Sequence, residues 1–189
     1  FMSANDNPKN VHFSQEELDA AIEEAARRDV PVMAHAHATE GIKMAVRAGV
    51  RTIEHGSFLD EEGMDLMIKH GTYLIPTLAV GLYTDYPLIG KDALKKAMNE
   101  NAKANAGTYE NMRLAIRKGV KFGLGTDDVG WPPDFSAIEL EAYVELGMTP
   151  MQAILCATRT NAEILMLQGI LNLYQYETHE AIEYFNKAI

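Results

Sequence analysis

The sequence predicts an α/β fold with parallel strands, because short apolar segments alternate with helical segments along the chain. Three predicted helices are each followed by a glycine that directly precedes a strand, at Gly49, Gly71 and Gly119. Glycine at this position is typical of a left-handed helix C-cap. Strands that are separated by whole helices pair in parallel through βαβ units. We therefore expect a parallel sheet with helical crossovers.

Local signals place the individual elements. Ser14 and Glu17 form the S-x-x-E pattern of a capping box at the start of the first helix. The expected strands cover residues 30–35, 50–54, 72–78 and 120–125, and the first of them has the composition of a buried strand. The expected helices cover residues 14–28, 39–48, 60–69, 91–118, 136–146 and 149–165. Four strands are too few to close a barrel of eight.

The composition is that of an ordinary globular protein and argues against several function classes. Hydrophobic residues make up 47% of the 189 residues, and the formal net charge is −10. An acidic chain argues against nucleic-acid binding, which requires a basic face. No apolar run approaches the roughly 20 residues that span a bilayer. Cys156 is the only cysteine, which fits a reducing compartment, and we expect a cytoplasmic protein. The chain begins with Phe1 rather than Met, so the lack of a visible signal peptide says little about targeting.

Side chains that can bind a metal stand at the ends of three of the four predicted strands. His35 and His37 close the first strand, His55 closes the second, and Asp127 follows the fourth. Function in parallel α/β folds is located at the carboxyl ends of the strands. Because side chains alternate along a strand, His35 and His37 are expected on the same face of the sheet. The pattern predicts that these residues share one site.

The residue types fit a catalytic metal centre. Neutral imidazole and carboxylate are common zinc ligands, and a bound metal brings the pKa of water to about 7. A carboxylate beside that water can take up its proton and pass it to a leaving group. The alternative is a separate structural role for each residue, such as a hydrogen-bonded histidine or a turn-capping aspartate. His35, His55 and Asp127 together favour the metal site, whereas His37 fits either role equally well.

The same segments resemble the amidohydrolase superfamily, and within it the imidazolonepropionase-like and Xaa-Pro dipeptidase (prolidase-like) branch. Residues 32–42 resemble the fifth-strand motif of the family, residues 52–57 the sixth, residues 73–78 the seventh and residues 125–127 the eighth. Residues 147–162 are similar to the helical segments that follow. The resemblance covers the chain from about Ser3 to Leu165, with the four motifs in the family's order.

This resemblance implies half of a (β/α)8 TIM-type barrel, comprising strands five to eight. It implies hydrolysis of an amide, dipeptide or cyclic-amide C–N bond at a centre of one or two zinc ions. His35 and His55 would be metal ligands, and Asp127 would be both a metal-site residue and the catalytic acid/base. His37 and Tyr73 would lie near the substrate, which we expect to be a small peptide-like or amide molecule.

Two features depart from the family pattern. The family's first-strand His-x-His pair and its fourth-strand carboxylated lysine have no counterpart in this sequence. We therefore expect the chain to be incomplete as an enzyme by itself, and to associate with a second copy or with a complementary half-barrel. The tail, residues 168–189, weakly resembles a tetratricopeptide-repeat helix and is read more simply as one amphipathic helix, which divides the chain into units 1–167 and 168–189. The alternative function is a non-catalytic half-barrel fragment, or a self-associating scaffold whose tail binds a partner.

Overall fold

A computed structural model describes residues 7–79, 107–127 and 135–165 of the chain. The predicted helical tail at 168–189 and the first part of the predicted helix 91–118 lie outside the described residues. In chain order the elements are α1 (Gln15–Ala26), β1 (Met33–Ala36), α2 (Thr39–Ala48), β2 (Thr52–His55), α3 (Glu61–His70), β3 (Tyr73–Ile75), α6 (Thr108–Lys118), β4 (Lys121–Phe122), α7 (Phe135–Glu145), α8 (Pro150–Leu155) and the π-helical segment η2 (Cys156–Thr160).

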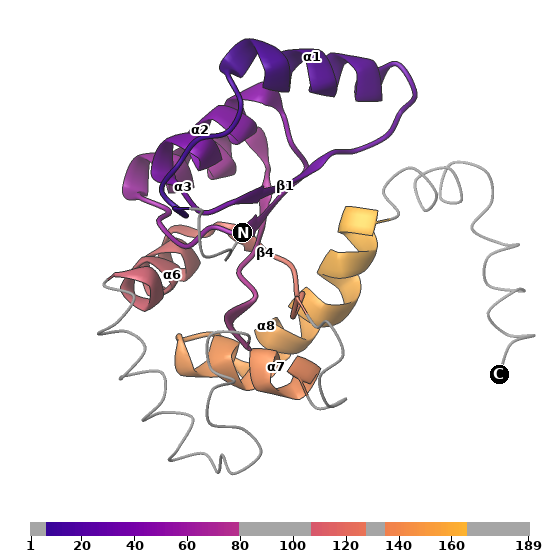
Figure 1. Cartoon of the computed structure of the whole chain (residues 1–189). Coiled ribbons are helices and arrows are strands. Elements are labelled where there is room, and N and C mark those ends of the chain that lie inside the picture. Colours follow the sequence, from indigo (N-terminus) through magenta and orange to yellow (C-terminus); the bar gives the residue numbers. More distant parts are fainter. Residues whose placement is uncertain (1–6, 80–106, 128–134, 166–189) are drawn as a thin grey trace, which may run out of the picture.

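The four strands form one parallel sheet in the order β1-β2-β3-β4 (Figure 1). Each neighbouring pair is joined through at least one helix, as the alternating sequence pattern predicts. The register places Ala36 beside His55 and Glu54 beside Ile75, so the carboxyl ends of β1, β2 and β3 meet at one edge of the sheet. The prediction of four parallel strands is confirmed.

Helix boundaries agree well with the local signals in the sequence. Ser14 caps α1 in a capping box with Glu17, in which each side chain bonds the other residue's backbone N–H. Asp60 caps α3 through the backbone N–H of Gly63. Gly49 ends α2 in the left-handed conformation, with a φ of 105°, which only glycine adopts without strain. None of the described helices is both long and apolar enough to cross a membrane.

β4 covers only Lys121–Phe122 of the predicted residues 120–125. β3 and β1 differ from their predictions for physical reasons. β3 ends at Ile75, because Pro76 has no N–H to donate to a neighbouring strand and Thr77 has a φ of 51°. β1 starts at Met33 and alternates between exposed and half-buried residues, so the prediction of a buried strand was wrong. Within the described sheet β1 is an edge strand that pairs only with β2, and Met33 is 58% exposed.

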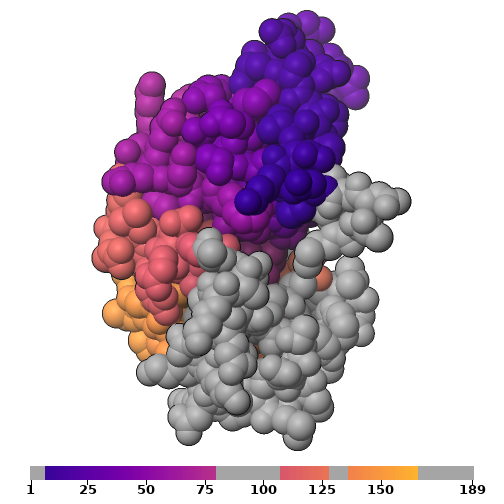
Figure 2. Space-filling model, turned by 60° about the vertical axis from the view of Figure 1, so that its left-hand side comes forward, coloured from indigo at the N-terminus to yellow at the C-terminus, as the bar shows by residue number. Residues whose placement is uncertain are grey.

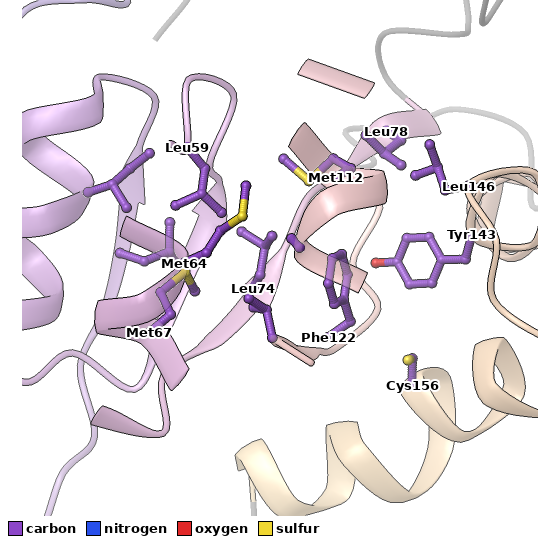
Figure 3. Close-up of a cluster of buried hydrophobic side chains, with 14 of the residues drawn as sticks. Leu59, Met64, Met67, Leu74, Leu78, Met112, Phe122, Tyr143, Leu146 and Cys156 are labelled. Atoms are coloured by element: carbon purple, nitrogen blue, oxygen red, sulfur yellow. The ribbon is translucent and has the colours of Figure 1, made fainter. Parts of the chain in front are cut away.

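The main core lies between one face of the sheet and the helices. Figure 3 shows Leu74 of β3 between the α3 side chains Met64 and Met67 and the ring of Phe122 in β4. The Tyr143 ring of α7 meets Phe122 edge to face, with ring centroids 5.9 Å apart. In the space-filling view, residues 107–127 lie between residues 7–79 and residues 135–165 (Figure 2). This main cluster joins the sheet to α3 and α7, and a second, smaller cluster joins Tyr73 and Ile75 of β3 to Ile164.

Gly123 marks the closest packing between β4 and the last helices. A Cβ added at Gly123 would lie 2.6 Å from Ile164 Cδ1 and 2.8 Å from Asn161 Oδ1. Asn161 cannot move away without loss, because its side chain accepts from Leu124 N and donates to Leu124 O. We expect Gly123→Ala to lower the free energy of unfolding by about 1–3 kcal/mol through overpacking, measured by urea denaturation.

Gly41 in α2 provides the matched control for this substitution. Its nearest neighbours would lie 3.8 Å and 3.9 Å from an added Cβ, which is ordinary van der Waals contact. Gly41→Ala should raise the free energy of unfolding by about 0.5–1 kcal/mol, because alanine restricts the unfolded chain. Equal urea midpoints for Gly123→Ala and the wild type would contradict the packing described for β4.

Candidate metal site at the carboxyl ends of the strands

Two histidines from adjacent strands face each other at the carboxyl edge of the sheet. His35 lies within β1, and His55 is the last residue of β2. His35 Nδ1 and His55 Nε2 are 2.9 Å apart, and the ring planes are tilted by 41°. One nitrogen must donate a hydrogen and the other accept it at this distance. The pair that the sequence predicted as metal ligands is thus in direct contact.

The orientation of His55 is fixed by a second contact on its other ring nitrogen. His55 Nδ1 is 2.7 Å from Thr77 Oγ1, and Thr77 follows the carboxyl end of β3. A metal-binding histidine is commonly held in this way, with one nitrogen bonded to the protein and the other directed at the metal. The sequence places Thr77 inside the predicted strand 72–78 and gives it no firm role; the signal that could have marked it is Pro76 directly before it, which cannot donate to a neighbouring strand.

His37 lies over the ring of His55. The two rings are stacked, with centroids 4.6 Å apart and planes within 6°. Ser57 Oγ lies 2.8 Å from His37 Nδ1 and so links His37 to the loop after β2. The prediction that His35 and His37 share one face agrees with the structure, since both contact the same imidazole. Ser57 was not anticipated as part of this group.

The backbone is strained at three of the strand ends. His55, Thr77 and Asp127 have φ values of 72°, 51° and 52°, the left-handed region that side chains other than glycine rarely occupy. Each such residue costs on the order of 1–3 kcal/mol and persists only where its surroundings hold it. Non-glycine residues in this conformation cluster at functional sites. The strain therefore indicates that the identity of the side chain is important at the carboxyl ends of β2, β3 and β4.

The electrostatic surroundings keep His55 neutral. Burial, together with the neighbouring His37 and His35, lowers the pKa of His55 to about 4, while the charge of Asp127 opposes the shift. Glu54, the residue before His55, has a raised pKa because it is buried, and the Thr52 hydroxyl that donates to its carboxylate partly offsets this. Neutral imidazole is the form that binds a metal. His55 is thus preset in its ligand form.

Asp127 lies near this group without completing it. The carboxylate is exposed and follows β4, and its charge acts on both His55 and Glu54. Among residues 7–79, 107–127 and 135–165, no three His, Cys, Asp or Glu side chains are arranged to hold a metal ion. The structure therefore brings His35, His37 and His55 together, and the role of Asp127 as a third ligand stays a prediction.

Tyr73 is placed away from the histidines. It begins β3, at the opposite end of the strand from Thr77, and is 4% exposed. The cationic groups of Arg51 and Lys121 lie 5.6 Å and 5.1 Å from its ring centroid. The structure does not bring Tyr73 to the histidine group, and its contact with substrate stays a prediction.

The histidine pair fits a divalent metal of the zinc type. Two nitrogen ligands of a tetrahedral zinc, each about 2.0–2.1 Å from the metal, lie roughly 3.3 Å apart. The 2.9 Å separation of His35 Nδ1 and His55 Nε2 is therefore only a few tenths of an ångström too short. Two imidazoles and a nearby carboxylate are donors that zinc accepts. The residues present are compatible with the metal.

A pH titration tests the surroundings of His55 directly. We expect the His55 ring signals in a 1H–15N NMR spectrum to titrate with a midpoint near pH 4, because burial and the two neighbouring histidines oppose its protonation. Since the pKa is lowered on folding, the unfolded chain binds more protons between pH 6.5 and 4. The free energy of unfolding should fall as the pH falls through this window, and less so in His55→Asn. A midpoint above pH 6 would contradict the described contacts.

Comparison with known proteins places these observations in a family. The model of the amidohydrolase family matches residues 1–170. The Aspergillus niger ochratoxinase is 38% identical over 161 residues, which is 83% of this chain and 32% of that protein. The crystal structure of a Xaa-Pro dipeptidase with bound methionine in the active site matches with a TM-score of 0.70 and 36% identity, over 85% of this chain and 40% of that one. A prolidase complexed with N-methylphosphonate-L-proline matches with a TM-score of 0.68 and 32% identity, over 88% of this chain and 41% of that one.

The chain thus spans between 32% and 41% of the length of these relatives. Its four parallel strands and their helices correspond to part of the TIM-type barrel of the family. The resemblance seen in the strand-end motifs is confirmed by a family match that covers most of the chain. The chain belongs to the amidohydrolase family.

Proposed function

We propose that this chain supplies part of a metal-dependent hydrolase site that cleaves an amide C–N bond. The observation that carries the proposal is the approach of His35 Nδ1 to His55 Nε2, with the other nitrogen of His55 held by Thr77. A histidine with a purely structural role needs only a hydrogen-bond partner. His55 combines a second imidazole at this distance with a lowered pKa and a left-handed backbone. These features are expected of a preset ligand.

In this proposal His35 and His55 hold the metal, and Asp127 acts as the acid/base. A divalent metal bound here would polarise the substrate carbonyl and make water nucleophilic at neutral pH. Asp127 would accept a proton from the attacking water and return it to the leaving nitrogen as the C–N bond breaks. The products are a carboxylate and an amine, and the carboxylate of Asp127 is regenerated. The charge of Asp127 reaches His55, which supports its place beside the metal.

The proposed substrate is a small molecule with a peptide-like or cyclic amide bond. This class is supported by the names of the relatives, which include a Xaa-Pro dipeptidase, a prolidase and an ochratoxinase. The stacked ring of His37 forms a wall beside His55, so His37 is the side chain that we propose to contact the substrate. One or two zinc ions, as the family resemblance implies, remain part of the proposal.

We also propose that the open edge of β1 is covered by a second copy of the chain or by a complementary half-barrel. Val30 and Met33 are 54% and 58% exposed beside this edge, and β1 pairs only with β2 in the described sheet. Exposed strand edges with apolar side chains favour pairing with another strand. Partner groups at this edge would also lie close to His35.

The predicted cytoplasmic location stays a prediction.

Sedimentation velocity tests the proposed association. The chain should sediment as a dimer or larger assembly at high protein concentration and dissociate on dilution, because pairing at the β1 edge is concentration-dependent. Replacing Met33 by lysine should shift this equilibrium toward the monomer, since a charge at an exposed edge opposes pairing. A monomer that keeps a well-dispersed NMR spectrum at every concentration would contradict the proposal.

Metal binding and activity test the proposed function with three substitutions. We expect His55→Ala to lower the zinc content of the purified chain and, in the completed assembly, to abolish zinc-dependent hydrolysis of a dipeptide with a carboxyl-terminal proline. Asp127→Asn should reduce kcat by about 10²–10⁴-fold, because it removes the proton acceptor. Zinc is measured by mass spectrometry and hydrolysis by the release of proline, with the assembly state held constant.

His70→Ala is the matched control, since His70 is an exposed histidine at the end of α3. It should leave zinc content and hydrolysis unchanged. If the wild type binds no more zinc than His55→Ala, the proposed site is wrong. If zinc binds as expected and no amide is cleaved even when a partner chain completes the assembly, the hydrolase proposal fails while the metal site stands.

A further inference from the structure

Glu139 in α7 is a fully buried carboxylate that binds the backbone directly after Thr77. Its two oxygens accept from Leu78 N at 3.0 Å and from Ala79 N at 2.6 Å. Glu139 is 0% exposed, and it lies 61 and 60 residues further along the chain than the two amides it binds. The contact fixes the segment that carries Thr77, whose hydroxyl holds His55.

Tyr143, one helical turn further along α7, makes a similar contact with the next strand end. Its hydroxyl donates to the carbonyl oxygen of Gly123 at 2.7 Å, and its side chain is 0% exposed. Figure 3 shows this hydroxyl pointing from α7 toward the ring of Phe122 in β4. Gly123 lies four residues before Asp127, so Tyr143 holds the strand end that leads to that carboxylate.

These polar contacts have a cost that helix packing alone does not explain. A buried carboxylate is unfavourable even when hydrogen-bonded, and burial raises the pKa of Glu139 to about 7 against the opposing effect of its backbone N–H donors. An apolar side chain of similar size would pack α7 against the sheet without this penalty. The backbone that the two residues bind, however, leads into or out of strained positions, Thr77 and Asp127. The hydrogen bonds of Glu139 and Tyr143 hold the backbone next to these strained positions.

We propose that Glu139 and Tyr143 are positioning residues of the metal site. Glu139 holds Thr77, and through Thr77 it directs Nε2 of His55 toward His35. Tyr143 holds the end of β4 and thereby the place of Asp127. This inference rests on the proposed function, because it assigns the two residues to the geometry of the same site.

Glu139→Gln is the direct test, with Glu141→Gln as its matched control. Glutamine keeps the size of the side chain but offers one oxygen in place of two, so one backbone N–H loses its acceptor. Glu141 lies two residues further along α7, is exposed, and undergoes the same replacement of a carboxyl group by an amide. We expect Glu139→Gln to weaken zinc binding by 10–100-fold, as supporting residues of metal sites do, and Glu141→Gln to leave it unchanged. Zinc affinity is measured on the full chain by competition with a chromophoric chelator.

The ring nitrogens of His55 provide a second readout that needs no metal. In the zinc-free chain, Glu139→Gln should shift the 15N signals of His55, because the Thr77 contact at Nδ1 is disturbed. Tyr143→Phe should weaken zinc binding through Asp127 while leaving the His55 signals in place. A folding defect alone would lower thermal stability without producing these two different patterns.

The outcomes separate the inference from the function on which it rests. A folded Glu139→Gln chain with unchanged zinc affinity and unchanged His55 signals would overturn the inference. If Glu139→Gln does not fold, Tyr143→Phe decides, and unchanged zinc affinity in that variant overturns it equally. If the wild type binds no zinc, the proposed function fails, and the His55 signals of Glu139→Gln alone decide whether that residue positions the histidine.

Discussion

The bond between Thr77 and Nδ1 of His55 is the contact on which the site depends. It joins the ends of β2 and β3 and leaves Nε2 of His55 directed at His35 in β1. Three neighbouring strands are thereby tied together through one imidazole ring. Both ring nitrogens of His55 are hydrogen-bonded and the ring is stacked on His37. These three contacts oppose rotation of the ring. A ligand held in this way loses little conformational entropy when it binds a metal.

The strand ends differ from the rest of the fold in how they are stabilised. The core is held by apolar packing around Leu74, which would tolerate conservative replacement. The strand ends instead combine left-handed backbone at His55, Thr77 and Asp127 with buried hydrogen bonds from α7. Local strain of this kind is maintained by surrounding structure and is typical of sites that serve a function. Apolar packing therefore stabilises the scaffold, whereas buried hydrogen bonds hold the strained backbone of the site.

Local signals in the sequence predicted most of the fold. Capping residues such as Ser14 and C-cap glycines such as Gly49 set helix ends within one or two residues, because those interactions are short in range. The contact between His35 and His55 was predictable from the shared edge of parallel strands. The bond from Glu139 to residues 78 and 79 was not, because it joins segments 60 residues apart. The exposure of β1 depends on its place at the sheet edge, and no local pattern reports that position.

In the proposed site, His35 Nδ1 and His55 Nε2 share one metal ion. The most direct measurement is an anomalous difference map at the zinc absorption edge from a zinc-soaked crystal of the chain. We predict a peak between the two histidines, about 2.0–2.1 Å from each nitrogen, with the nitrogens moved apart to roughly 3.3 Å. A map in which the two nitrogens remain bonded to each other at 2.9 Å, with zinc absent or bound elsewhere, would contradict it.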